Sequence, residues 1–92
     1  MLEQADHPAY DLAMELLCLL PPAPIGVPVV LLAEDLGLGR QIQIYRLADK
    51  LKKQGIRLVD YRGKGPNTLS VAKRSWGLAA ELAESYLDVV GG

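Results

Sequence analysis

The sequence predicts a mainly α-helical domain with one small β-hairpin. Three observations support this fold class. Apolar residues recur at helical spacing in four segments, and glycines and prolines separate these segments. Two short runs of β-prone residues flank a glycine-rich tip. A chain of 92 residues has room for one hydrophobic core, so we expect residues 1–92 to form a single domain.

Residues 8–20 form the first expected helix. Pro8 suits the first helical position, Asp6 or His7 can cap it, and two consecutive prolines follow its end. The only charged side chains in this segment are two acids. Because a helix that is apolar nearly all round must be covered on more than one side, we expect it to have several neighbours.

Residues 28–36 and 40–54 are the second and third expected helices. Gly37 ends the second helix, Gly39 caps the third, and Gly55 ends the third. Apolar side chains in the third helix recur at positions i, i+3, i+4 and i+7, which is typical of a stripe that faces a core. This stripe consists of Ile44, Leu47, Ala48 and Leu51.

Residues 56–71 are expected to form the hairpin. Its strands are 56–61 and 68–71, and the segment between them is rich in glycine and polar residues that favour turns. A last helix is expected over residues 75–90.

The charge of this chain is strongly segregated. All ten Lys and Arg residues lie between Arg40 and Arg74, where only two acids accompany them, so this segment carries a net charge of +8. Residues 1–39 contain six acids and residues 75–92 contain three, and neither segment has a Lys or Arg. A concentrated positive surface attracts a polyanion, most often a nucleic-acid backbone.

The second and third helices and the hairpin resemble a known family. Two short helices joined by a glycine turn, with the second amphipathic and basic, are typical of a helix-turn-helix. Segment 32–38 reads LAEDLGL and is similar to the LAEELGV segment of winged helix-turn-helix proteins. Segment 50–56 (KLKKQGI) resembles the end of their recognition helix, and segment 62–65 (RGKG) resembles the wing of biotin-operon-repressor-like regulators. The resemblance covers residues 9–71.

This resemblance implies a winged helix-turn-helix with a three-helix core, a two-stranded wing and an added C-terminal helix. It also implies duplex DNA binding and, commonly, a dimeric transcriptional regulator. Helix 40–54 would lie in the major groove, which an α-helix fits, and the wing would reach a neighbouring phosphate. The expected DNA-binding residues are Arg40, Gln41, Ile42, Gln43, Tyr45, Arg46, Lys50, Lys53, Arg62 and Lys64.

Several of these residues have a purely structural alternative. Arg46 and Lys50 could be solvated helix charges, and Lys64 could be an exposed turn residue. Ile42 could touch a thymine methyl group or pack against the wing. Tyr45 projects away from the core stripe, where a phenol is unusual unless something covers it.

The helix over residues 75–90 predicts a homodimer. Its apolar residues spread over about half of the helix circumference, which is wider than the stripe of about 100° that one core needs. The alternative is a small protein that wraps this helix over its own core. Because the first helix is also apolar nearly all round, we expect a dimer packed through both helices, with an interface at Leu82, Tyr86 and Val90.

The sequence favours neither enzymatic chemistry nor a bound cofactor or metal. His7 and Cys18 have no spacing typical of a catalytic pair, and no Cys/His cluster offers metal ligands. A single cysteine and the lack of a long apolar run favour a cytoplasmic protein outside the membrane. Two other functions fit the basic segment. One is a winged-helix module that docks an acidic protein, and the other is a DNA-binding protein of replication or partition.

Overall fold

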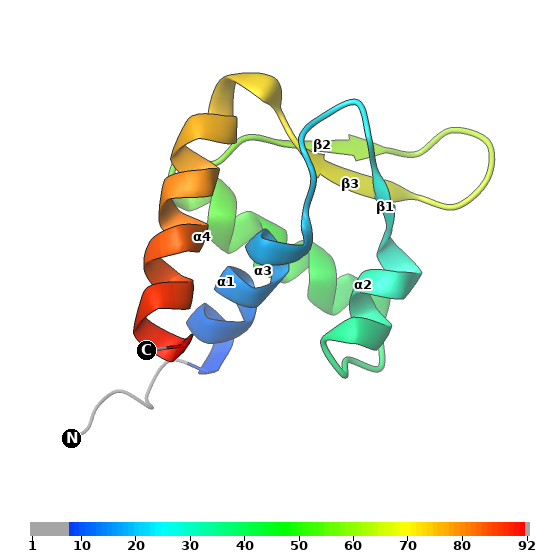
Figure 1. Ribbon diagram of the computed structural model, residues 1–92. Helices are drawn as coiled ribbons and strands as arrows, with labels where there is room; N and C mark the ends of the chain where they lie inside the picture. The colour runs from blue at the N-terminus through cyan, green and yellow to red at the C-terminus, as the bar shows by residue number, and fades with distance from the viewer. Residues whose placement is uncertain (1–7, 92) are drawn as a thin grey trace.

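The computed structural model describes residues 8–91, and the side chains of residues 12–89. This part consists of four α-helices and a small three-stranded antiparallel sheet (Figure 1). The elements are α1 Pro8–Leu19, β1 Val27–Pro28, α2 Val29–Asp35, α3 Gln41–Lys53, β2 Leu58–Tyr61, β3 Thr68–Val71, the short 3-10 helix η2 Lys73–Ser75, and α4 Trp76–Gly91. The mainly helical fold class with a small β-hairpin is therefore confirmed.

One core joins the helices to the sheet. The stripe predicted for α3 is confirmed, because Ile44, Leu47, Ala48 and Leu51 are all buried. α1 packs against both α3 and α4, so its prediction as a helix covered on several sides is also confirmed. By contrast, Ala79 is the only fully buried apolar residue among the described side chains of α4.

Both glycine helix ends are confirmed. Gly37 follows α2 with a φ of 71°, and Gly55 follows α3 with a φ of 94°, a left-handed region that favours glycine. After α2 the N–H of Leu38 donates to the carbonyl of Ala33 at 2.8 Å. After α3 the N–H of Ile56 donates to the carbonyl of Leu51 at 3.1 Å. These bonds satisfy carbonyl groups that a helix end leaves without partners.

The first predicted strand, 56–61, is wrong at its start, because β2 begins only at Leu58. Ile56 lies just after the turn that ends α3, donates its N–H to the carbonyl of Leu51 and is fully buried. The N–H of Arg57 donates to the hydroxyl of Ser75 at 2.9 Å, and its carbonyl accepts from the N–H of Ala72 at 2.9 Å. Arg57 therefore binds the connection that leads into α4.

The two-stranded wing is a second correction, because the sheet has three strands in the order β1-β3-β2. Pro28, expected as the start of a helix, belongs to β1 and pairs with Thr68 of β3. The helix α2 begins one residue later, where the N–H of Val29 donates to the carbonyl of Asn67 at 2.8 Å. The hairpin is thus tied to the start of α2 as well as to its own strands.

The last helix also differs at its start. The chain first forms η2 and then continues as α4 from Trp76. Ser75 is buried, and its hydroxyl has a partner there because it accepts the hydrogen bond from the N–H of Arg57. The expected caps of the first helix, Asp6 and His7, lie outside the described residues.

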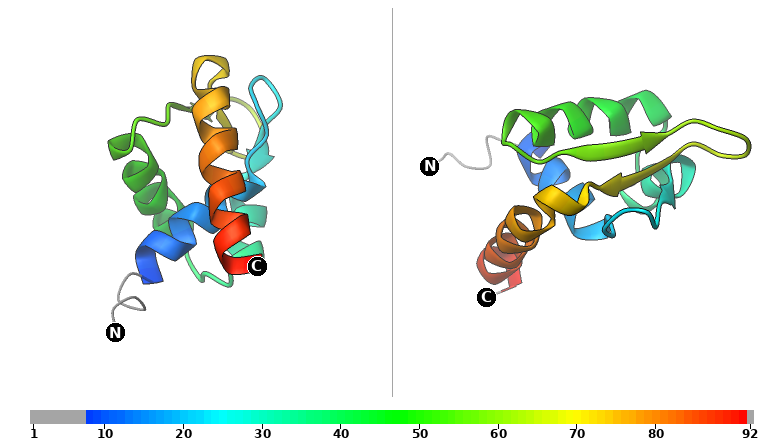
Figure 2. Two further views of the ribbon diagram at one scale, coloured as in Figure 1. Left: turned by 60° about the vertical axis from the view of Figure 1, so that its left-hand side comes forward. Right: turned by 90° about the horizontal axis from the view of Figure 1, so that it is seen from above.

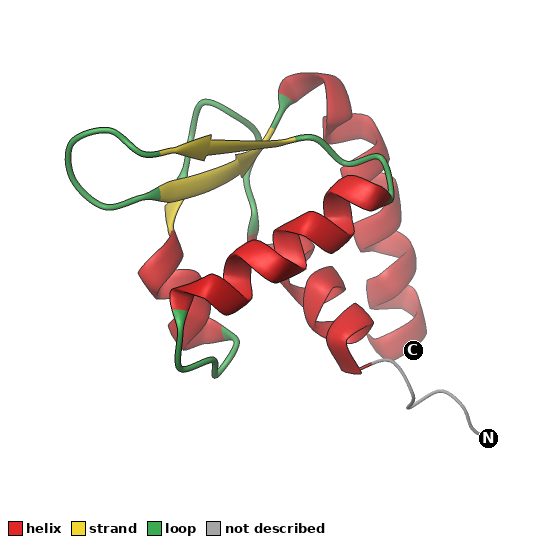
Figure 3. Ribbon diagram, turned by 180° about the vertical axis from the view of Figure 1, so that it is seen from behind, coloured by secondary structure: helices red, strands yellow, loops and turns green. Residues whose placement is uncertain are grey.

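The elements give the molecule two different sides. α3 passes behind α1 in Figure 1 and lies nearest the viewer in Figure 3, where the hairpin extends beside it. Figure 2 shows the β2–β3 hairpin reaching beyond the helices. α1 and α4 lie on the side away from α3's exposed face (Figure 1).

Candidate nucleic-acid interface

The outward side of α3 is exposed and mostly basic. Arg46, Lys50 and Lys53 are exposed there. Ile42 adds an apolar side chain that is 53% exposed, and Asp49 adds one acid. Side chains spaced in this way along an exposed helix can reach a surface that runs parallel to the helix axis.

The start of α3 differs from its prediction. The cap is Arg40 rather than Gly39, and Arg40 has the extended backbone of a cap residue, with φ −138° and ψ 140°. Its N–H donates to the Oε1 atom of Gln43 at 3.2 Å. The side-chain oxygen of Gln43 is therefore engaged within the helix start, while Gln41 is exposed.

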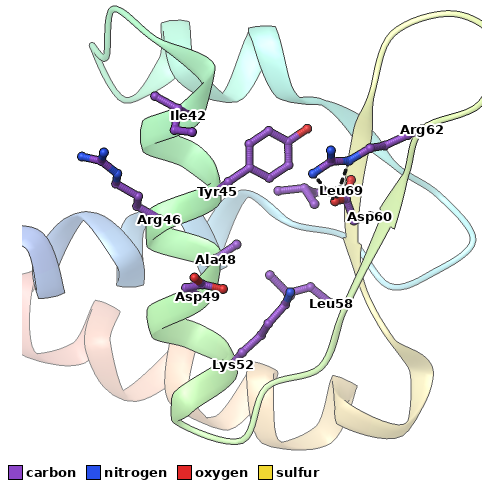
Figure 4. A pocket seen from close by; sticks show the side chains of 10 residues that line it. All are labelled: Ile42, Tyr45, Arg46, Ala48, Asp49, Lys52, Leu58, Asp60, Arg62 and Leu69. Atoms are coloured by element: carbon purple, nitrogen blue, oxygen red, sulfur yellow. Dashed lines mark hydrogen bonds and ion pairs between the residues drawn. The ribbon is translucent and has the colours of Figure 1, made fainter.

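Tyr45 links α3 to the hairpin. It is half-buried and packs against the core from the side of α3 that faces β2 and β3. The Nδ2 group of Asn67 donates to its hydroxyl at 3.3 Å, and the guanidinium carbon of Arg62 lies 4.7 Å from its ring centroid. Figure 4 shows Tyr45 pointing toward Arg62, whereas Arg46 points away from the hairpin. The cover that this phenol requires is thus supplied by the hairpin.

Arg62 is held in place by two partners. Its Nε group donates to the Oδ2 atom of Asp60 at 2.9 Å, and its Nη2 atom forms an ion pair with the same oxygen at 2.9 Å. The hydrogen bond and the charge of Asp60 raise the pKa of Arg62 above its ordinary value. The guanidinium also lies over Tyr45, as an arginine can over an aromatic face. Arg62 therefore differs from a free surface arginine, since Asp60 already balances its charge.

A groove of about 250 Å³ separates α3 from the hairpin (Figure 4). Residues of α3, β2 and β3 line it, together with Arg62. Three bases and two acids lie among them, so the charge of the groove is mixed. Its lining residues are Ile42, Tyr45, Arg46, Ala48, Asp49, Lys52, Leu58, Asp60, Arg62 and Leu69.

The structure therefore unites only part of the predicted site. Ile42, Tyr45, Arg46 and Arg62 line the groove together. Gln43 and Lys50 do not line this groove, and together with Arg46 they line a separate hollow of about 210 Å³ beside Leu12 and Leu38. Neither Lys53 nor Lys64 lines the groove or this hollow. Lys64 is exposed at the tip of the hairpin, between Gly63 and Gly65.

The sequence prediction missed Lys52. This exposed lysine lines the groove at position i+7 from Tyr45, so the helical spacing of Tyr45, Asp49 and Lys52 could have revealed it. Three further exposed bases, Arg57, Lys73 and Arg74, were also left out of the predicted site. They belong to the segment before β2 and to η2, at the end of the sheet away from the hairpin tip.

On α4, the residues of the predicted dimer interface lie partly in the core. Leu82 and Tyr86 are half-buried and pack against it, and the side chain of Val90 lies outside the described residues. The more exposed apolar side chains of this helix are Trp76, Leu78, Leu87 and Val89.

No family model, no curated protein and no solved structure matches this chain. Within residues 8–91 no helix is long and apolar enough to span a membrane. The same part of the chain contains no group of three His, Cys, Asp or Glu side chains that could hold a metal ion.

Proposed function

We propose that this protein is a non-enzymatic regulator of transcription that binds duplex DNA through a winged helix-turn-helix. In this proposal α2 and α3 form the helix-turn-helix, α3 enters the major groove, and the β2–β3 hairpin is the wing. The observation that carries the proposal is the gathering of exposed bases on the outward side of α3, within a segment of net charge +8.

The shape of α3 supports this proposal. An α-helix with its side chains is about 10–12 Å wide, and the major groove of B-DNA is about 12 Å wide. Its opposite side is fully occupied by the core stripe, so the helix can keep its position while its outward residues contact a partner. The hairpin extends beyond the helices (Figure 2). A DNA backbone next to α3 would pass along this hairpin.

The site residues would then have separate roles. Arg46, exposed beside Ile42, would read base edges, while Lys50, Lys53 and Lys64 would contact phosphates. Tyr45 would hold the wing at a fixed position relative to α3, since it contacts both Arg62 and Asn67.

The salt dependence of binding tests this function. If about five phosphates are neutralised, the logarithm of the association constant for duplex DNA falls linearly with the logarithm of the salt concentration, with a slope of about −4 to −5. Fluorescence anisotropy with a labelled duplex measures this slope. No binding at low salt would reject the proposal and favour a module that docks an acidic protein surface. A duplex selected from a random pool would then distinguish a regulator from a replication or partition protein by the position of its sites.

We also propose that the protein binds DNA as a homodimer. One edge of α4 carries Leu78 and Val89, which are 42% and 81% exposed, with half-buried Leu82 between them. Pairing two such edges about a two-fold axis would remove these side chains from water and would leave Glu81, Glu84 and Asp88 outside the contact. Half-sites about 34 Å apart would follow, and with them a pseudo-palindromic target.

Sedimentation equilibrium tests the dimer at micromolar protein concentration. The expected mass is that of two chains for the natural protein and of one folded chain for Val89→Glu. A mass of one chain in both proteins would reject the dimer. A dimer that Val89→Glu leaves intact would reject this edge as the interface.

A further inference from the structure

A second groove lies on the side of the molecule away from the exposed side of α3. Its volume is about 680 Å³, and residues of α1, α2 and α4 line it. These elements lie in front of α3 in the view of Figure 1, and behind it in Figure 3. The lining residues are Glu15, Cys18, Leu19, Asp35, Leu36, Tyr86 and Leu87.

The lining of this groove is mostly apolar. Leu19 of α1 is 38% exposed and Leu87 of α4 is 52% exposed, while Leu36 and Tyr86 are half-buried between them and the core. Removing exposed apolar area from water is favourable, so a partner that covers both leucines is favoured. Two apolar side chains from different helices also offer separate anchor points within one groove.

The charges around this groove are all of one sign. Glu15 and Asp35 are exposed at its edge, and no basic residue is among its described lining residues. α4 adds the exposed Glu84 and Asp88 on its outer side. Burial, and after it the charge of Glu15, raises the pKa of Cys18 above its ordinary value. The groove therefore presents apolar contacts inside a negative field.

We propose that this groove binds a basic amphipathic helix of another protein. Such a helix would place apolar side chains at i, i+4 and i+7 over Leu19, Leu36 and Leu87, and Lys or Arg side chains beside Glu15 and Asp35. This function goes beyond DNA binding, because it would connect bound DNA to a second protein through the opposite side of the domain.

Charge distinguishes this partner from a second copy of the chain. A symmetric contact of two such grooves would bring Glu15 and Asp35 close to the same acids of the other copy, which is unfavourable. Within one molecule no Lys or Arg is among the described residues that line the groove, so its acids have no basic neighbour there. The proposed homodimer edge at Leu78 and Val89 does not line the groove, so both contacts can form together.

Two synthetic peptides of equal apolar spacing provide the test. One carries Lys and the other Glu at the positions between the leucines, and each is titrated into the full ¹⁵N-labelled chain. We expect the Lys peptide alone to shift the amide resonances of Glu15, Leu19, Leu36 and Leu87, with saturation. DNA takes no part in this titration, so its failure would leave the DNA-binding proposal intact.

Variants locate the binding. Leu87→Ala and Asp35→Asn should each weaken the Lys peptide several-fold, since each removes one anchor or one charge of the groove. Leu31→Ala and Glu81→Gln are the matched controls, because both residues are exposed and lie outside the groove and the proposed homodimer edge. Thermal unfolding checks that all four variants remain folded.

Three results would overturn the proposal. The first is the absence of any shift with the Lys peptide. The second is an equal loss of affinity in the groove variants and their controls, which would mean attraction to acidic surface in general. The third is a shift of the groove resonances with protein concentration alone, which would mean that a second copy occupies the groove.

Discussion

α3 and α4 are both amphipathic helices on one small core, yet they use their surfaces in opposite ways. α3 buries four apolar residues in a single stripe and exposes mainly charged residues. α4 buries only Ala79 fully among its described side chains and exposes apolar residues on both sides of it. α3 therefore needs no partner for its apolar side, whereas α4 retains apolar surface that its own fold does not cover.

The largest expected effect is on the free energy of unfolding, which a substitution in α3 should lower far more than one in α4. Leu51→Ala on α3 removes a fully buried side chain and should lower the free energy of unfolding by about 2–5 kcal/mol. Leu87→Ala on α4 removes a side chain that is 52% exposed and should change it by less than about 0.5 kcal/mol. Urea unfolding followed by circular dichroism measures both values. Similar losses in the two variants would mean that α4 contributes to the core as α3 does.

A second prediction divides the basic surface itself. Arg46→Ala should cost about 1–3 kcal/mol of binding free energy on the preferred duplex and should relax the choice of base. Lys64→Ala, at the hairpin tip, should weaken binding about equally for all sequences. Anisotropy titrations with the preferred and a scrambled duplex give both quantities. Identical profiles for the two variants would remove the distinction between a reading helix and a positioning wing.

Much of α3 could be predicted from the sequence because its information is local. The spacing of Ile44, Leu47, Ala48 and Leu51 follows from one helical period, and Gly37 and Gly55 mark the neighbouring ends. The direction of Tyr45 could not be predicted in the same way. It lies at the edge of the stripe, and only the position of Asn67 and Arg62, far along the chain, decides what covers it.

β1 shows a second limit of the sequence. It has only two residues, and one of them is a proline, which donates no backbone hydrogen bond. The sequence therefore contains no alternating pattern from which this strand could be predicted. Its pairing with Leu69 and Thr68 arises because the chain from α1 returns past β3 before α2 begins. Arg57 was predicted to lie in a strand because its sequence neighbours favour strands. Its backbone instead forms hydrogen bonds with Ser75 and Ala72, at η2 and the residue before it.

A smaller effect is expected where α3 meets the hairpin. Tyr45→Phe removes the hydrogen bond from Asn67 but keeps the ring under Arg62, so it should lower the free energy of unfolding by about 0.5–1.5 kcal/mol. Tyr61→Phe, on an exposed tyrosine of β2, is the matched control and should have less effect. Urea unfolding of both variants makes the comparison. Equal stabilities would mean that the Asn67 bond does not hold the hairpin to α3.

The smallest effect is expected at Asp60, and it concerns the charge of the proposed DNA-binding surface. In the free protein Asp60 holds Arg62 by a hydrogen bond and an ion pair, so Arg62 is balanced before any phosphate arrives. Asp60→Asn should release Arg62 and raise the affinity for duplex DNA by about two- to fivefold, because one more phosphate can be neutralised and the local field becomes more positive.

The salt dependence of this variant identifies the cause. A newly neutralised phosphate should steepen the slope of the logarithm of affinity against the logarithm of salt by about 0.9. Asp49→Asn is the matched control, since Asp49 lines the same groove but forms no ion pair with Arg62. It should raise affinity by its charge alone and leave the slope unchanged. Equal changes of affinity and slope in both variants would mean that the ion pair with Asp60 does not restrain Arg62. The groove would then affect DNA affinity only through its net charge.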